Sequence, residues 1–200
     1  YAASIGAKAV ITKDTHERAT DRTAEAMEKI ETAEGVRMDI VVMIQGDEPM
    51  VTPEMIDAAV RPLVEDETVL VSNLMAPLYG AAEHDDRNEV KVVVDGNNNA
   101  LYFSREAIPS RWKLGEKVPM NKQVCIISFQ RDFLLKFNAL EPTPLEIAES
   151  VDMMRVLEHG YKVKMAPAPE GITYSVDTPE DLADVEEAMQ SDSLVVKYKR

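Results

Sequence analysis

Residues 39–49 read DIVVMIQGDEP, and this stretch decides the fold. After Asp39 the first half, up to Ile44, is an uninterrupted apolar run, which is typical of a buried strand and favours a parallel sheet. The second half turns polar at once, with Gly46 beside the carboxylates of Asp47 and Glu48. Because ligands of such sheets bind beyond the carboxyl ends of the strands, we expect the chemistry of this protein in this loop.

Helices alternate with strands on both sides of this stretch. Residues 20–34 are strong helix formers with one apolar side, and Thr52-Pro53-Glu54 predicts a capped helix to about Glu65. Further strands are expected at 69–74, 90–94, 100–104, 123–129 and 162–165, and further helices at 131–139, at 145–159 and after Thr178. Residues 90–94 and 100–104 flank the turn DGNNN and predict a hairpin. We therefore predict an α/β fold, with a mixed, mostly parallel sheet covered by helices.

Composition narrows the range of partners. The 200 residues contain 22 Lys and Arg against 36 Asp and Glu, a net charge of −14, which argues against a nucleic acid or an anionic membrane as a partner. The single cysteine, Cys125, excludes an internal disulfide framework and a multi-cysteine zinc site, and points to a reducing compartment. With no long apolar run and no signal-peptide pattern, we expect a soluble, cytoplasmic protein.

Two aspartates are the leading candidates for chemistry. Asp47 leaves a buried strand beside a glycine and could hold a divalent cation against phosphates; alternatively it caps a turn while Glu48 is solvated. Asp177 stands before Thr178-Pro179-Glu180-Asp181, which is also what a well-capped acidic helix start looks like. Since each aspartate follows a strand, the two could meet at one magnesium ion.

Cationic and polar candidates are less specific. Thr20-Asp21-Arg22 opens a helix whose free N–H groups could bind an anion, or it is a plain cap with an Arg22–Glu25 pair. Arg105 and Arg111 could each bind a carboxylate or phosphate, or form surface ion pairs. Cys125 lies in an apolar strand, where we expect a small buried side chain and not a nucleophile.

A phosphate-binding glycine loop is missing from the sequence, because its glycines never form Gly-x-Gly or a P-loop. Either the protein binds no nucleotide, or we expect its first strand and phosphate loop to lie upstream of Tyr1.

Seven segments together resemble the 3-deoxy-manno-octulosonate (Kdo) cytidylyltransferases of the nucleotide-sugar pyrophosphorylase superfamily. In order, they read TDRTAE (20–25), VMIQGDEP (42–49), VKVVVD (90–95), ALYFSR (100–105), PLE (144–146), RVL (155–157) and VDTPEDL (176–182). The resemblance covers nearly all of residues 7–189, and QGDEP with ALYFSR and VDTPEDL is its specific part.

The resemblance implies a Rossmann-like nucleotide-diphospho-sugar transferase fold and transfer of CMP from CTP to a 3-deoxy-2-ulosonic acid, for cell-surface polysaccharides of the bacterial type. It implies that Asp47 and Asp177 carry catalytic Mg²⁺ and that Gln45, Thr20 and Arg22 lie at the nucleotide. It places Arg105, Arg111 and Asp152 on the sugar side, and it implies a homodimer.

Three departures accompany the resemblance. The family's amino-terminal strand and phosphate loop are not in residues 1–200, so we expect a single domain that lacks both. Lys122-Gln123 stands where the family usually has Arg-His, and Asp152-Met153 stands where it has Glu-Gln. Because the last two departures fall on the sugar side, alternatives are a nucleotidyltransferase with a different acceptor or a non-catalytic remnant.

Overall fold

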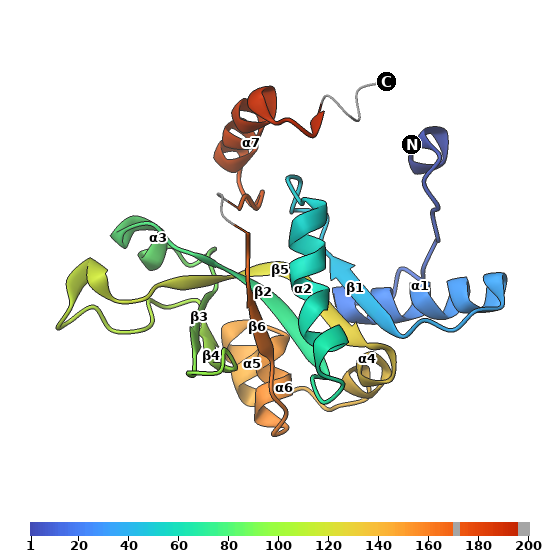
Figure 1. Ribbon diagram of the computed structural model, residues 1–200, viewed down its shortest axis with the longest axis horizontal. Coiled ribbons are helices and arrows are strands. Elements are labelled where there is room, and N and C mark those ends of the chain that lie inside the picture. Colours follow the sequence, from blue (N-terminus) through green and yellow to red (C-terminus); the bar gives the residue numbers. More distant parts are fainter. Residues whose placement is uncertain (170–172, 196–200) are drawn as a thin grey trace.

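The structure is a computed structural model that describes residues 1–169 and 173–195 (Figure 1). Its helices are η1 (Ala2–Ile5), α1 (Ala19–Glu34), α2 (Pro53–Glu65), α3 (Ala81–Asp85), η2 (Gly115–Lys117), α4 (Arg131–Asn138), α5 (Pro144–Glu149), α6 (Met153–Glu158) and α7 (Pro179–Ser191). Its strands are β1 (Ile40–Ile44), β2 (Val71–Pro77), β3 (Lys91–Val94), β4 (Ala100–Ser104), β5 (Asn121–Gln130) and β6 (Lys164–Pro167). The α/β class and the predicted order of elements are confirmed.

The long strand β5 organises the sheet. The order is β4-β3-β5-β2-β6, and β1 pairs with β5 beyond this path. β5 runs antiparallel to β1, β2 and β3, and β4 runs antiparallel to β3, so β2–β6 is the parallel pairing among the described strands. The sheet is mixed, as predicted, but its parallel share is smaller than predicted. The apolar run of β1 predicted a buried strand, but only Met43 is buried and Ile44 is 40% exposed. The run also does not reveal that its neighbour β5 runs in the opposite direction.

Helices cover both faces of the sheet, and the alternation of side chains along each strand divides the core. On one face the buried side chains of α1, α4 and α6 pack against Ile127 and Phe129 of β5. On the other face Met55 and Ala59 of α2 pack against Val124 and Ile126 of the same strand. Of the helices within the described ranges, none has the length and apolar character that crossing a bilayer requires.

One predicted helix is divided in two. Residues 145–159 form α5 and α6, because Ser150 adopts a left-handed conformation with φ of 54° and ends α5. The break places Asp152 at the start of α6 and not in the middle of a continuous helix.

Candidate active site

The loop that follows β1 is fastened to the middle of β5. The Gln45 N–H donates to the Cys125 carbonyl over 3.3 Å, and the Cys125 N–H donates to Glu48 Oε1 over 2.8 Å. These bonds hold Asp47 between them, and its Oδ1 is buried without a hydrogen-bond partner among the described residues. No hydrogen bond from the rest of the described chain reaches the Asp47 carboxylate, so it caps no turn there. Glu48 is buried, which contradicts the alternative of a solvated side chain.

The loop before α7 meets this first loop, as the sequence predicts. The Val176 N–H donates to the Asp47 carbonyl over 2.9 Å. The cap of α7 is made by Thr178 and Asp181: the Thr178 N–H donates to Asp181 Oδ2 (2.7 Å) and the Asp181 N–H donates to Thr178 Oγ1 (3.2 Å). Since the cap does not use the Asp177 carboxylate, that exposed group is available to a ligand.

Four carboxylates act electrostatically on Cys125. Burial raises the pKa of its thiol to about 12, and the charges of Glu48, Asp47, Asp177 and Asp152 add to the effect. Burial also raises the pKa of Glu48 to about 7, reinforced by the charge of Asp47. Cys125 thus stays a neutral thiol and not a nucleophile, as predicted, although its side chain is half-buried and not fully buried as expected.

Two carboxylates would be sufficient to hold a magnesium ion that is shared with phosphates. Within residues 1–169 and 173–195, no three His, Cys, Asp or Glu side chains form a metal-binding group by themselves. Mg²⁺ usually takes one or two carboxylates and fills its octahedron with water and phosphate oxygens, so a pair is sufficient. The unpartnered Oδ1 of Asp47 is the oxygen that such an ion would satisfy.

The three predicted nucleotide-binding residues differ in their exposure and in their contacts. Gln45 lies in the loop beside Asp47 and is half-buried. Thr20 is 1% exposed, inside the first turn of α1, and its Oγ1 has no partner among the described residues. The exposed Arg22 donates to Thr12 Oγ1 (2.6 Å) and does not pair with Glu25. The helix begins at Ala19 with Arg18 as its N-cap, so the prediction that Thr20 opens it is wrong by one residue.

Two predicted sugar-side arginines already have protein partners. Arg105 donates from Nε to the Glu149 carbonyl (3.0 Å) and from Nη1 to the Arg87 carbonyl (2.9 Å). Arg111 pairs with Asp85 of α3, with 2.7 Å between Nη2 and Oδ2. Arg111 thus forms the surface ion pair that the sequence left open as an alternative.

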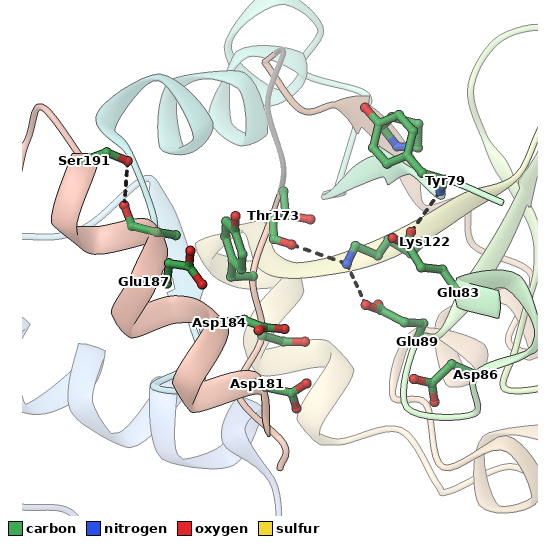
Figure 2. Close-up of a pocket in the computed structure, with 14 residues that line it drawn as sticks. Tyr79, Glu83, Asp86, Glu89, Lys122, Thr173, Asp181, Asp184, Glu187 and Ser191 are labelled. Atoms are coloured by element: carbon green, nitrogen blue, oxygen red, sulfur yellow. Dashed lines mark hydrogen bonds and ion pairs between the residues drawn. The ribbon is translucent and has the colours of Figure 1, made fainter. Parts of the chain in front are cut away.

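A cavity of about 590 Å³ opens beside the Asp177 loop, between α7 and the end of β2 (Figure 2). Lys122 reaches into it and pairs with Glu89 over 2.7 Å between Nζ and Oε1. The other charged side chains of its lining are carboxylates, from Glu83, Asp86, Asp181, Asp184 and Glu187. The lining can accept many hydrogen bonds from hydroxyl or ammonium groups.

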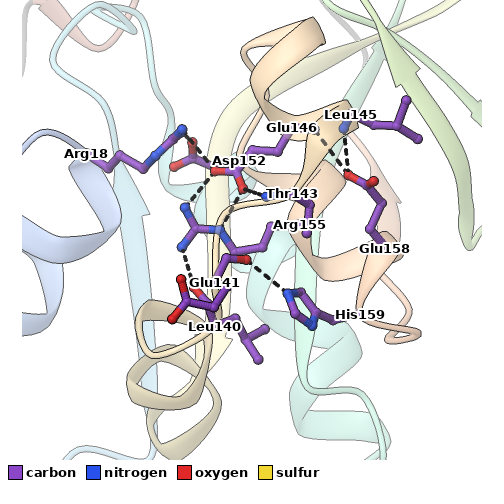
Figure 3. A network of polar contacts seen from close by, with 10 residues as sticks. All are labelled: Arg18, Leu140, Glu141, Thr143, Leu145, Glu146, Asp152, Arg155, Glu158 and His159. Carbon is purple, nitrogen blue, oxygen red and sulfur yellow. Dashed lines mark hydrogen bonds and ion pairs between the residues drawn. The ribbon is translucent and has the colours of Figure 1, made fainter.

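A network of ion pairs holds Asp152 (Figure 3). Arg155 binds Glu146 through two bonds of 2.7 Å, and both side chains are almost completely buried. Arg18 lies 3.0 Å from Glu146, between Nη2 and Oε1, and its Nη1 binds Asp152 Oδ1. Arg18 and Glu48 are the residues near the candidate site that sequence reasoning missed. No local signal marks them, because their partners Asp152 and Cys125 lie far along the chain.

The sequence profile of the cytidylyltransferases matches residues 1–165. The chain belongs to the cytidylyltransferase family. This cytidylyltransferase is 39% identical to 3-deoxy-manno-octulosonate cytidylyltransferase of Acaryochloris marina, over 89% of the chain and 70% of that protein. It is 41% identical to the same enzyme of Solibacter usitatus, over 90% and 69%.

Solved structures agree with the fold of this cytidylyltransferase. A CMP:2-keto-3-deoxy-manno-octonic acid synthetase complexed with CTP superposes with a TM-score of 0.83 at 34% identity, over 94% of this chain and 74% of that one. The 4-diphosphocytidyl-2C-methyl-D-erythritol synthase of Anaerococcus prevotii shares the fold alone, with a TM-score of 0.54 at 14% identity, over 92% and 70%.

Proposed function

We propose that the protein transfers CMP from CTP to Kdo, or to a closely related 3-deoxy-2-ulosonic acid, and releases pyrophosphate. The observation that carries this proposal is the contact between the Asp47 and Asp177 loops, in a chain similar to enzymes named for this reaction. We place the reaction in cytoplasmic synthesis of cell-surface polysaccharides such as lipopolysaccharide.

In this proposal Asp47 and Asp177 hold Mg²⁺. A bound magnesium ion would offset charge on the phosphates and polarise the α-phosphorus. The chain contributes placement: the Cys125 backbone fastens the loop that carries Asp47, and the Val176 N–H holds the Asp177 loop against it. Gln45, Thr20 and Arg22 are assigned to the nucleotide side.

The acceptor supplies the attacking atom. Its anomeric oxygen forms a bond to the α-phosphorus, the bond from that phosphorus to the bridging oxygen breaks, and the electron pair leaves with pyrophosphate while the hydroxyl proton passes to solvent. We assign Asp152, with Arg105 and Arg111, to the acceptor side. To bind an acceptor carboxylate, the guanidinium groups of Arg105 and Arg111 would have to contact it in addition to, or in place of, their present protein partners.

A second candidate is the same transfer to an acceptor that carries an amine. The acidic lining of the cavity beside Asp177 favours it, because five carboxylates there surround the single Lys122–Glu89 pair. An ammonium group gains from such surroundings, whereas a second anionic group does not.

We also propose a homodimer. Trp112 is 90% exposed and Leu114 is 59% exposed in the segment between β4 and β5. These side chains form apolar surface that a second copy would cover.

Pyrophosphate release from CTP tests the function, with Kdo, its 8-amino analogue and sialic acid as acceptors and with or without Mg²⁺. We expect magnesium-dependent release with Kdo or the amino analogue, at least about tenfold faster than with sialic acid. ATP and GTP in place of CTP serve as controls. Release with none of the three acceptors would contradict the proposal and favour the non-catalytic reading.

A further inference from the structure

Arg18 bridges two parts of the molecule that sequence separates widely. It is the N-cap residue of α1, which carries the nucleotide-side candidates Thr20 and Arg22. Its guanidinium contacts Glu146 of α5 and Asp152 at the start of α6 (Figure 3).

Within the network, Arg18 matters more to Asp152 than to Glu146. Glu146 is already satisfied by the two-pronged Arg155 and by the Thr143 N–H. Asp152 has no other hydrogen-bonded cation among the described residues. Removal of Arg18 therefore leaves Glu146 paired and leaves Asp152 without a partner.

The Asp152 carboxylate has one anchored oxygen and one open oxygen. Its Oδ1 accepts from Arg18, whereas Oδ2 accepts no hydrogen bond from the described residues and is not among their fully enclosed unpartnered atoms. The side chain is 22% exposed, so Oδ2 reaches solvent. A fixed carboxylate with a free oxygen is well suited to accept a hydrogen bond from a sugar hydroxyl.

We propose that Arg18 is a positioning residue for the acceptor: it fixes Asp152 through Oδ1 so that Oδ2 accepts a hydroxyl of the sugar acid. This inference rests on the proposed function and on the assignment of Asp152 to the acceptor side. The break at Ser150, which sets Asp152 at the head of α6, provides the geometry.

Electrostatics give the proposal a pH signature. Burial raises the pKa of Asp152, and Arg18 opposes the rise. The charges of Glu146 of α5 and Arg155 of α6 also act on this carboxylate, and the charge of Asp152 in turn acts on the neutral Cys125 thiol of β5. Without Arg18, the pKa of Asp152 rises further, and protonation removes the acceptor oxygen's charge at a higher pH.

The test is Arg18→Gln in the whole protein. We expect the acceptor KM to rise about tenfold or more, with kcat and the CTP KM within about twofold of wild type. As pH falls from about 8 to about 6, the acceptor KM of Arg18→Gln should rise more steeply than that of wild type. Arg18→Lys should restore most of the wild-type pH profile, and Arg18→Gln/Asp152→Asn should lose the added pH dependence.

Arg131→Gln is the matched control, because Arg131 also ties α1 to another helix, through Glu31 at 2.7 Å between Nη2 and Oε2. It should lower stability to a similar degree without changing the acceptor KM. An Arg18→Gln variant that matches Arg131→Gln in acceptor KM at every pH would overturn the proposal. If Arg18→Gln does not fold, Asp152→Asn alone decides: an unchanged acceptor KM overturns the proposal, and a rise of about tenfold supports it. Failure of the wild type to turn over would instead refute the proposed function.

Discussion

The two acidic regions of this protein are built in opposite ways. In the Figure 3 network, Glu146 and Asp152 each contact a guanidinium, and the buried Glu146 and Arg155 side chains satisfy each other through two hydrogen bonds. At the meeting of the two loops, the charges of Asp47, Asp177 and Glu48 all act on Cys125, and none of the three carboxylates forms an ion pair with another described residue. We interpret the first group of charges as structural and the second as a ligand site. Like charges without a compensating partner cost stability, and proteins retain such clusters mainly where a ligand binds.

The largest effect is expected at the loop carboxylates. Asp47→Asn and Asp177→Asn each keep side-chain volume and remove a metal ligand, so pyrophosphate release should fall about 1000-fold or more while the melting temperature stays within a few degrees. Asp57→Asn, on the exposed side of α2, is the control and should behave as wild type. Near-normal turnover in either site variant would place these carboxylates outside the reaction.

The network should show the reverse behaviour, with a large loss of stability. The Glu146 side chain is 0% exposed, and Arg155→Met removes the guanidinium that binds both of its oxygens. Because a buried charge then lacks its main partner, the free energy of unfolding should fall by about 3–5 kcal/mol. Urea unfolding measures this loss. The double variant Glu146→Leu/Arg155→Met should recover much of it; a single variant as stable as wild type would show that the pair is dispensable.

A smaller effect is expected at Cys125. A pKa of about 12 lowers the thiolate fraction about 1000-fold relative to a free thiol. A more basic thiolate is also more nucleophilic, which offsets part of the loss in reaction rate. Alkylation by iodoacetamide at pH 8 should therefore be about 50-fold slower in the folded protein than in urea. Equal rates in the two states would contradict the acidic, buried surroundings described for this strand.

Most helices and strands could be predicted from sequence because their signals are local. A capping Thr before Pro predicted α2 and α7. The candidate ligands are Asp47, which closely follows β1, and Asp177, which lies ten residues after the end of β6. The contacts that position them could not be predicted. Arg18 reads as one more charge in a polar stretch, since its partner Asp152 lies 134 positions further along the chain.

The direction of the strand next to β1 and the burial of Glu48 could not be predicted from sequence, for the same reason. The apolar residues of β1 are equally compatible with a parallel or an antiparallel neighbour, and the direction is set by β5, about 80 residues later. Glu48 follows Asp47 directly and has the same charge. Yet the Glu48 carboxylate accepts a hydrogen bond from the backbone of β5, whereas Asp47 Oδ1 has no partner among the described residues. Long-range pairing, and not local composition, assigns their different environments.

Calorimetric titration of Mn²⁺ or Mg²⁺ in the presence of CTP, without acceptor, tests the central claim most directly because it needs no turnover. We expect one metal ion bound per chain in wild type and in Asp57→Asn, and binding weakened about 100-fold or more in Asp47→Asn and in Asp177→Asn. Unchanged metal affinity in the two site variants would contradict the claim that these loops meet to hold a cation.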